Sequence, residues 1–426
     1  MRNPDSAHVL SCKASDAHGS RSAVRQFASY LRFISCAEEA ARIIRAIGSE
    51  EAGVQIMKHK SVFRAIQIYD VPSHSALIVK QEALACGADA AVSREALNGK
   101  NTDILIMGTE AQLFRLAEKL AHQYKSLKDM GREIVRLLEN AERLPAPIKI
   151  RGAVFGWKRT YIMGVLNVTP DSFSDGGKFL DAGAAAKQAL EMEKEGADII
   201  DVGGESTRPG SEPVSAEDEL KRVIPVIKAI RKKSKIPISI DTYKPEVAAA
   251  AMEAGADMIN DVYGLRQKGM LETAAKAGVP VVIMHMLGKP KDMQAKPEYK
   301  DVVAESIEFL RERICTARAA GIKNIIIDPG IGFGKRTGAG IEDNCEILRR
   351  LAEYKTLGCP VLVGASRKRF IGNILGGLPE SERLEGTLAA CAIGAIKGAN
   401  IVRVHDVKEA VRAIKIADAV MQSRGK

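Results

Sequence analysis

Residues 195–204, which read EGADIIDVGG, contain the pattern that decides the fold. Gly196 follows a helix-length amphipathic segment, and a glycine suits the left-handed position at which a helix ends. The run Asp198–Val202 then carries neighbouring apolar residues rather than a strict alternation, which is typical of a strand covered on both faces. The segment therefore predicts a helix, a tight turn and a buried parallel strand in succession.

The same junction recurs along the chain after residue 150, with further helix-ending glycines at Gly255, Gly278, Gly321 and Gly398. Eight short apolar runs alternate with helix-length segments, and they are Tyr161–Leu166, Asp198–Val202, Ile236–Ile240, Met258–Asn260, Val279–Met284, Ile325–Ile327, Pro360–Val363 and Ile401–Val404. Eight βα units over about 270 residues predict a (β/α)8 TIM barrel of the α/β class. A doubly wound sheet is the alternative, although eight regular units favour closure.

The composition is that of an ordinary soluble globular protein. The chain has 426 residues, of which 46% are hydrophobic and only 4% aromatic, so we expect two domains and an aliphatic core. Seven cysteines without a CxxC pair favour free thiols in a reducing cytoplasm. No apolar run is long enough to span a membrane, and the start lacks a secretory signal. The net charge of +10 is spread along the chain, which is weak evidence for nucleic acid and fits an anionic small-molecule substrate equally well.

The first 147 residues differ in pattern from the rest. Residues 1–27 predict a flexible tail, residues 28–147 a small α/β domain, and residues 148–426 the barrel, with a boundary linker at Leu144–Pro147. Three roles are open for the small domain: an oligomerisation or stabilising module, a regulatory ligand site, or a second enzyme. Its predicted strands are Tyr30–Cys36, Val62–Val71 and Thr102–Met107. Two helices are predicted at Ser73–Cys86 and Ser126–Asn140. A third starts at the capping-box pair Thr109 and Gln112 and runs to about His122.

Polar residues follow every one of the eight predicted strands. Catalytic groups of a TIM barrel lie at the carboxyl ends of its strands. A single aspartate after a strand more often caps the next helix, but eight polar ends favour a polar small-molecule site. The residues are Asn167, Asp201, Asp241, Asn260, His285, Asp328, Ser366 with Lys368, and Arg403 with His405.

The two histidines of the barrel region lead to different predictions. Arg403 and His405 lie two residues apart on a predicted strand, so they share one face and would present two cationic donors. Such a pair suits a phosphate or diphosphate. His285 is equally compatible with a satisfied core residue and with a site residue.

Three polar, glycine-containing loops follow predicted strands. Thr169–Gly177 and Gly203–Gly210 are candidate lids above the site, with ordinary surface turns as the alternative. Asp328–Lys335 reads DPGIGFGK and matches neither a Walker A loop nor GxGxxG, which disfavours nucleotide binding by those modes.

Taken in order, these segments resemble the dihydropteroate synthases, members of the pterin-binding enzyme family of folate biosynthesis. The resemblance covers roughly residues 148–421. Its motifs are MGVLNVTPDSFSDGG at 163–177, IDVGGESTRPG at 200–210, IDT at 240–242, IND at 259–261, DPGIGFGK at 328–335, SRK at 366–368 and RVHD at 403–406. So many motifs in the family's order are highly specific, and the family's fold is the same barrel.

The resemblance implies a transferase that joins p-aminobenzoate to 7,8-dihydropterin-6-ylmethyl diphosphate and releases diphosphate. It further implies Mg²⁺ held through Asn167, a homodimer in the cytoplasm, inhibition by sulfonamides, and neither a nucleic-acid nor a membrane partner. Lys368→Ala or Arg403→Ala should abolish turnover and leave the melting temperature nearly unchanged.

Matching motif positions carry the family's residue roles onto this chain. The catalytic set would be Asp201, Arg208, Lys368, Arg403 and His405. The pterin would contact Asp241, Asn260, Asp328, Lys368 and Met284, and p-aminobenzoate would contact Thr207, Pro209, Phe173, Phe333 and Ser366. Asn167, Arg403 and His405 would bind the diphosphate. The segment Ile148–Tyr161, around Trp157, resembles the hairpin that closes the lower mouth of the barrel.

Two rival functions remain. A pterin-binding methyltransferase would move a methyl group from methyltetrahydrofolate to a corrinoid protein, but it has no need for Arg403-Val404-His405 or for the Ser206–Pro209 loop. A non-catalytic pterin-binding protein is disfavoured because every expected catalytic position is occupied. The departures from the family pattern are Tyr243, where many relatives carry serine, a longer stretch Arg336–Gly340, and residues 1–147.

Overall fold

The computed structural model describes residues 30–169, 182–206, 214–288, 297–338 and 341–423. The tail expected at residues 1–27 lies outside these ranges, as does most of each candidate lid.

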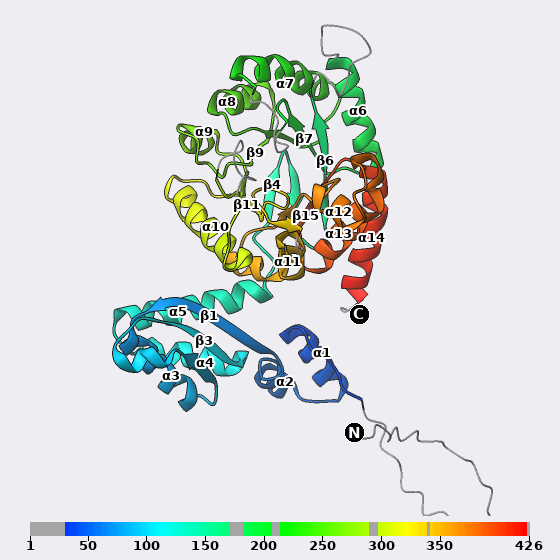
Figure 1. Ribbon diagram of the computed structural model, residues 1–426. Helices are drawn as coiled ribbons and strands as arrows, with labels where there is room; N and C mark the ends of the chain where they lie inside the picture. The colour runs from blue at the N-terminus through cyan, green and yellow to red at the C-terminus, as the bar shows by residue number, and fades with distance from the viewer. Residues whose placement is uncertain (1–29, 170–181, 207–213, 289–296, 339–340, 424–426) are drawn as a thin grey trace, which may run out of the picture.

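Eight parallel strands form a barrel with helices around it (Figure 1). Their order is β11-β10-β9-β8-β7-β6-β15-β14, and a parallel bridge between Ile327 and Val361 joins the two ends of the sheet. Each predicted apolar run overlaps one of these strands, so the predicted TIM barrel is confirmed. The strands are β6 Tyr161–Asn167, β7 Ile199–Gly203, β8 Ile238–Asp241, β9 Met258–Asp261, β10 Val281–Met284, β11 Ile325–Asp328, β14 Leu362–Val363 and β15 Ile401–Val404.

Helices cover the outside of the barrel, and glycines end several of them. Gly196 and Gly255 adopt left-handed conformations, with φ of +107° and +109°, directly after α6 and α8, as predicted. The helices are α6 Ala182–Glu195, α7 Ala216–Arg231, α8 Pro245–Ala254, α9 Met270–Ala277, α10 Val302–Ala319, α11 Asp343–Arg349, α12 Arg369–Ile374, α13 Leu384–Ile396 and α14 Val407–Ser423, with 3₁₀ helices η3 Leu351–Leu357 and η4 Glu380–Glu382. A hairpin of β12 (Thr337–Gly338) and β13 (Ile341–Glu342) precedes α11.

The inside of the barrel has an apolar layer with a polar layer above it. Side chains of a strand alternate between its two faces, so residues two apart share the inner face. Ile199 and Ile401 belong to one buried apolar cluster, and Asp201 and Arg403 follow them on the same strands. The alternation therefore points polar side chains into the barrel at the carboxyl ends of its strands.

A hairpin closes the opposite end of the barrel. It consists of β4 (Ile148–Ile150) and β5 (Ala153–Phe155), which pair antiparallel as the resemblance implies. Phe155 and Trp157 belong to the same buried cluster as the apolar layer of the barrel. The indole Nε1 of Trp157 donates to the Ala146 carbonyl over 2.9 Å, which satisfies the polar atom of the buried ring.

The described residues before 143 build a second, antiparallel sheet and are called the N-terminal unit below. The sheet has the order β1-β3-β2. Ile66, Ile104 and Ile106 on one face of this sheet pack in a cluster with Leu113 and Leu116 of a helix. The elements are α1 Ala37–Ala46, α2 Glu51–Lys58, β1 Phe63–Val71, α3 Ser73–Ala85, β2 Asp89–Val92, η1 Arg94–Asn98, β3 Thr102–Thr109, α4 Glu110–Leu120 and α5 Lys125–Glu142.

Most predictions for the N-terminal unit are confirmed, including the capping box of Thr109 and Gln112. The strand predicted at Tyr30–Cys36 is wrong, because the segment has no regular structure before α1 begins at Ala37. Tyr30 and Phe33 are exposed, and no described strand pairs with this segment. A β-prone stretch needs a partner strand, so sequence preference alone does not make a strand here. The sequence patterns also did not predict α1, α2 or β2.

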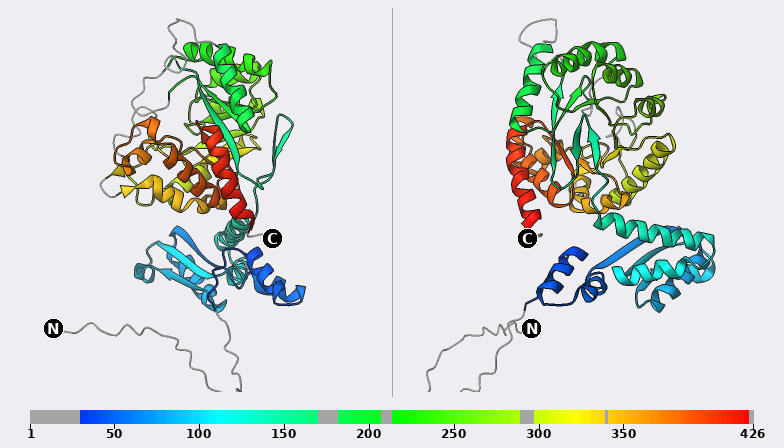
Figure 2. Two further views of the ribbon diagram at one scale, coloured as in Figure 1. Left: turned by 90° about the vertical axis from the view of Figure 1, so that its right-hand side faces the viewer. Right: turned by 180° about the vertical axis from the view of Figure 1, so that it is seen from behind.

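The N-terminal unit contacts the barrel through α5, which lies on the barrel side of the unit in every view (Figures 1 and 2). The side-chain amide of Asn140 donates to the Thr356 carbonyl over 2.9 Å, and Glu133 lies 3.5 Å from Arg311. Gly358 packs against Asn140, since a Cβ there would lie 2.8 Å from the amide nitrogen. The contact is thus formed by α5 against α10 and η3.

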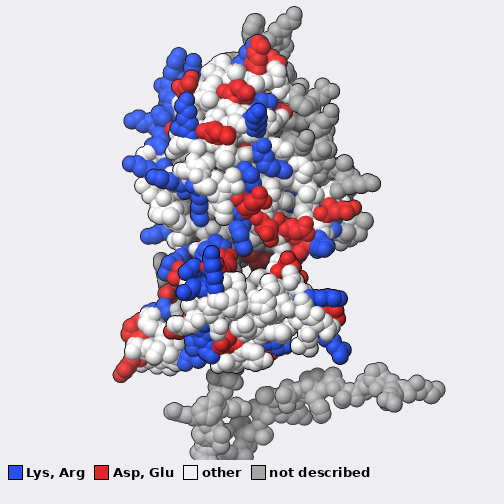
Figure 3. All heavy atoms as spheres, turned by 90° about the vertical axis from the view of Figure 1, so that its left-hand side faces the viewer, with Lys and Arg blue, Asp and Glu red and all other residues white. Residues whose placement is uncertain are grey.

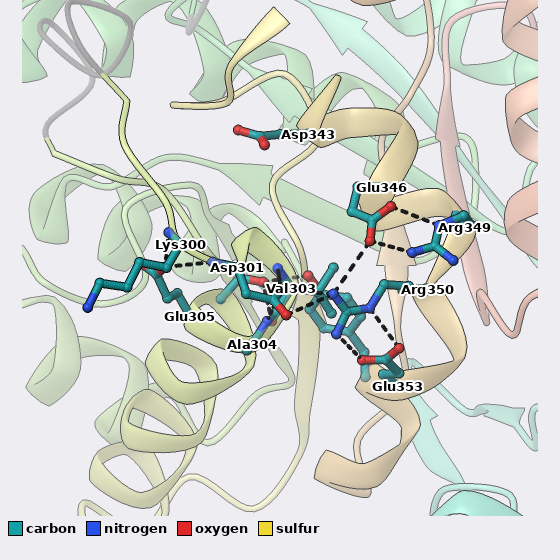
Figure 4. A network of polar contacts seen from close by, with 12 residues as sticks. Lys300, Asp301, Val303, Ala304, Glu305, Asp343, Glu346, Arg349, Arg350 and Glu353 are labelled. Carbon is teal, nitrogen blue, oxygen red and sulfur yellow. Dashed lines mark hydrogen bonds and ion pairs between the residues drawn. The ribbon is translucent and has the colours of Figure 1, made fainter. Parts of the chain in front are cut away.

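Arg350 forms ion pairs that connect the elements of the barrel wall that α5 contacts (Figure 4). Its guanidinium lies 2.9 Å from Asp301, 3.5 Å from Glu346 and 2.7 Å from Glu353. Asp301 also caps α10 by accepting a hydrogen bond from the backbone of Val303. The network holds the start of α10 against the α11–η3 segment, from which the chain enters β14.

Lys and Arg are interspersed with Asp and Glu over the barrel face shown in Figure 3. The charges of this face therefore do not form a region of one sign. None of the described helices combines the length and the apolar character that crossing a membrane requires.

Candidate active site

The polar layer of the barrel borders a cavity of about 550 Å³ at the carboxyl ends of the strands. The cavity is the place where residues far apart in the sequence meet. The predicted site residues that line it are Asn167, Asp241, Phe333, Ser366, Lys368, Arg403 and His405. Four further predicted residues, Asp201, Asn260, Met284 and Asp328, are buried at the ends of the adjoining strands.

Arg403 lies at the centre of the polar layer, between two carboxylates. Its Nε is 2.6 Å from Asp201 Oδ2, and its Nη2 is 2.6 Å from Asp241 Oδ2. Asn260 Nδ2 also donates to Asp201 Oδ2, over 2.9 Å. Fully buried Asp201 thus orients both Arg403 and Asn260.

Asp241 has a buried oxygen, Oδ1, that accepts no hydrogen bond from the described residues. A buried acceptor without a donor costs free energy, and a ligand that carries N–H groups can satisfy it. Burial raises the pKa of Asp241 to about 7, against the opposing charge of Arg403. The carboxylate is therefore a candidate contact for a donor-rich ligand.

Asp328 ends β11 and is buried where the glycine-rich loop begins. The Gly330 N–H donates to Asp328 Oδ1 over 2.7 Å. Burial raises the pKa of Asp328 to about 6, while the hydrogen bond from Gly330 and the charge of Lys368 act in the opposite direction. Asp241 and Asp328 are thus two acidic groups whose ionised forms the fold disfavours.

His405 lies beside Arg403 but is not a second cation. Burial lowers its pKa to about 3, and Arg403 adds to this effect, so the ring is neutral at pH 7. This pKa does not favour the second cationic donor that was predicted at His405. Its Nδ1 lies 3.0 Å from the Ser366 hydroxyl, and the same hydroxyl accepts from the His405 backbone over 3.2 Å. If Nδ1 accepts from Ser366, Nε2 carries the proton that a neutral histidine can donate.

One side of the site is apolar. Val262, Met284, Met286 and Phe333 form a buried cluster. The Lys368 ammonium lies 3.9 Å from the centre of the Phe333 ring, at cation–π distance. A flat aromatic ligand could therefore pack against this side while polar groups bind its edge.

The profile of the family described as "Pterin binding enzyme" matches residues 163–405. The chain belongs to the pterin-binding enzyme family.

Three similar proteins show how far the similarity extends. The dihydropteroate synthase of Synechocystis sp. is 47% identical over 284 residues, which are 66% of this chain and 97% of that protein. A solved structure of the Xanthomonas albilineans dihydropteroate synthase with 4-aminobenzoic acid has 47% identity and a TM-score of 0.61, and the match covers 65% of this chain and 98% of that one. The probable bifunctional folylpolyglutamate synthase/dihydropteroate synthase of Haloferax volcanii is 42% identical over 359 residues, 82% of this chain and 42% of that protein. Of these three matches, only the third extends well beyond the length of the barrel region.

Four predicted site residues of the pterin-binding enzyme motifs lie outside the described residues. They are Phe173, Thr207, Arg208 and Pro209. His285, for which two interpretations were open, is a buried residue whose Nδ1 lies 3.0 Å from the Lys335 ammonium. It is not among the residues that line the cavity.

Sequence patterns missed a charged cluster at the root of the second candidate lid. Glu205 lines the cavity and binds the Lys244 ammonium, which also lies 2.5 Å from Glu219. The Tyr243 hydroxyl donates to Glu205 over 3.1 Å. The tyrosine noted above as a departure from the family pattern thus holds Glu205, a contact that its place in the sequence does not reveal.

Proposed function

We propose that this chain is a dihydropteroate synthase, which joins p-aminobenzoate to 7,8-dihydropterin-6-ylmethyl diphosphate and releases diphosphate. The observation that carries the proposal is the buried, unpartnered Asp241 Oδ1 beside Arg403 in the cavity of a pterin-binding enzyme. The pterin end of the diphosphate substrate carries N–H groups and needs hydrogen-bond acceptors. Its diphosphate end carries phosphate oxygens and needs hydrogen-bond donors.

The pterin ring binds through its donor edge. A dihydropterin presents neighbouring N–H groups, which carboxylate oxygens accept. Asp241 Oδ1 and the Asp328 carboxylate serve as these acceptors, and the Asn260 amide completes the edge. Met284 supports the ring from the apolar side.

The leaving diphosphate is bound by Arg403 and His405. Two of the five N–H donors of Arg403 already bind carboxylates, so the others are left for phosphate oxygens. Neutral His405 donates a hydrogen bond without adding charge. Departure of diphosphate leaves positive charge on the methylene carbon, which ionised Asp241 and Asp328 stabilise.

The residues present also fit a magnesium ion. Asn167 lines the cavity, and its amide oxygen is a ligand type that Mg²⁺ accepts. Among the described residues, no group of three or more His, Cys, Asp and Glu side chains could hold a metal. Mg²⁺ binds well through few protein atoms when phosphate and water supply the rest. When bound there, it would neutralise charge on the diphosphate.

The p-aminobenzoate amine attacks the methylene carbon without activation by a Ser-His-Asp arrangement, because an arylamine is already a nucleophile. Phe333 and Ser366 form the described part of its pocket, and the Lys368 ammonium lies over the Phe333 ring. Phe173, Thr207 and Pro209 complete the pocket from the two lids in this proposal, and Arg208 of the second lid belongs to the catalytic set. The enzyme is further proposed to act as a homodimer in the cytoplasm and to be inhibited by sulfonamides.

An assay with Mg²⁺ and both substrates tests the proposal. The purified protein should release diphosphate and form dihydropteroate in equal amounts. Asp241→Asn should remove most of the turnover, whereas Glu253→Gln, an exposed change on the helix after the same strand, should not. Folded protein without product would refute the function, and methyl transfer from methyltetrahydrofolate to a corrinoid protein would support the rival.

A further inference from the structure

Lys335 is a buried lysine in the lining of the cavity, and 1% of the residue is exposed. It forms no ion pair with any carboxylate among the described residues. Its Nζ instead lies 2.9 Å from the Phe333 carbonyl, 3.1 Å from the Gly330 carbonyl and 3.0 Å from His285 Nδ1. These three contacts match the three N–H donors of an ammonium group.

The contacts of Lys335 hold the glycine-rich loop against the end of β10. His285 packs edge-on against Phe309 of α10, with ring centres 5.0 Å apart, so a contact outside the loop helps to set its position. A Cβ at Gly330 would lie 1.8 Å from the His285 carbonyl oxygen, so the backbone of the loop is in direct contact with this segment. The Tyr299 hydroxyl donates to the next carbonyl of the loop, that of Gly334, over 2.7 Å.

The same loop carries groups that face both proposed substrates. Gly330 N–H binds Asp328, as described above. A Cβ at Gly332 would lie 2.9 Å from the Lys368 side chain, so the stem of Lys368 rests on this glycine. Phe333 lies under the Lys368 ammonium. The position of residues 330–333 therefore sets the position of Phe333 and Lys368.

We propose that Lys335 is a positioning residue for the reaction proposed above, because its bonds to the Gly330 and Phe333 carbonyls and to His285 place Phe333 at the p-aminobenzoate pocket and Lys368 beside it. The inference rests on the proposed function for its kinetic part only.

The cost of burying this amine supports a role beyond packing. Burial lowers the pKa of Lys335 to about 7, which means that the fold disfavours its charge. An apolar side chain of similar size would avoid that cost. Both protonation states serve the proposed role, since a neutral amine still has two N–H donors for the two carbonyls.

Steady-state kinetics of Lys335→Met, which removes all donors at similar volume, test the inference. The KM for p-aminobenzoate should rise roughly tenfold, the usual effect of losing a charge-assisted hydrogen bond. Lys335→Gln retains two donors and should recover part of the loss. Lys276→Met on α9 is the control for removal of an exposed lysine. The inference would be overturned if a smaller fraction of the Lys335→Met enzyme were active while its KM for p-aminobenzoate stayed unchanged.

Amide hydrogen exchange provides a readout that does not depend on activity. In Lys335→Met, or in His285→Phe if the first variant does not fold, amides of residues 330–334 should exchange roughly tenfold faster than in the wild type. Amides of α10 should be unchanged. Equal exchange of the loop in wild type and variant would overturn the inference. Absence of turnover by the wild type, in contrast, would overturn the proposed function and leave the exchange result standing.

Discussion

Arg403 Nε donates to Asp201 Oδ2 over 2.6 Å, although the two residues are 202 positions apart in the chain. The bond joins β15 to β7 inside the barrel, and Arg403 reaches Asp241 on β8 as well. A residue proposed to bind the diphosphate is thus also the counter-ion of two buried carboxylates.

Arg403→Ala should therefore destabilise the fold as well as abolish turnover. Loss of the guanidinium leaves Asp201 and Asp241 buried without a counter-ion, and breaking a buried pair in this way costs roughly 3–5 kcal/mol. This outcome replaces the expectation, drawn from the resemblance, that the melting temperature stays nearly unchanged. Denaturant unfolding measures the effect. The double variant Arg403→Ala/Asp201→Asn should regain part of the stability but no activity, and an unaltered unfolding midpoint in Arg403→Ala would contradict the argument.

Lys368→Ala should lower turnover and leave stability almost unaltered. Its side chain is partly exposed at the cavity, so its removal empties no fully buried position. We expect turnover to fall by roughly 10²–10³-fold, as for loss of a charge-stabilising donor, and the melting temperature to change by less than about 2 °C. Lys323→Ala, an exposed change between α10 and β11, serves as the matched control. A large drop in melting temperature for Lys368→Ala would assign it a structural role instead.

Binding of a dihydropterin should strengthen as pH rises through about 6. Burial raises the pKa of Asp328 to about 6 in the folded protein, and only the ionised carboxylate accepts hydrogen bonds with both oxygens. The free energy of unfolding changes in the opposite direction, because ionisation of Asp328 at higher pH destabilises the folded state. Because an unfolded aspartate has a pKa of about 3.9, the folded state binds more protons between pH 4 and 6, so Asp328 lowers stability as pH rises across that interval.

Calorimetric titration with a dihydropterin at several pH values measures this dependence. Asp328→Asn should weaken binding and flatten the pH profile near 6. Asp301→Asn, at the start of α10 and away from the cavity, should retain the wild-type profile. Identical profiles for Asp328→Asn and the wild type would exclude Asp328 as the titrating group.

A chain that starts near residue 146 should retain turnover within roughly threefold. The described residues that line the cavity all come from positions 165–405, and barrel-only relatives such as the Synechocystis protein match almost over their full length. Its melting temperature should fall by several degrees, since the contact of α5 with η3 is lost. The assay and a thermal melt of both chains measure these effects. Loss of turnover in a folded short chain would show that the N-terminal unit contributes to catalysis.

The barrel and most of its site could be predicted because each rests on a local pattern. Apolar runs such as Ile325–Ile327 and helix-ending glycines such as Gly196 specify local structure without reference to distant partners. The rule that barrel sites lie at strand ends then selected Asp241, Asp328 and Arg403. The strand predicted at Tyr30–Cys36 is wrong, because a strand needs a partner strand that its own sequence does not specify.

The sequence by itself determined the order of strands and helices and the residue types at the strand ends, because hydrophobic periodicity and glycine conformation act within a few residues. Only the tertiary structure decided that Arg403 pairs with Asp201 and Asp241, that His405 is neutral and that Lys335 holds the glycine-rich loop. Pairing, charge state and loop position depend on burial and on partners far apart in the chain. These are physical conditions that exist only after the barrel has closed.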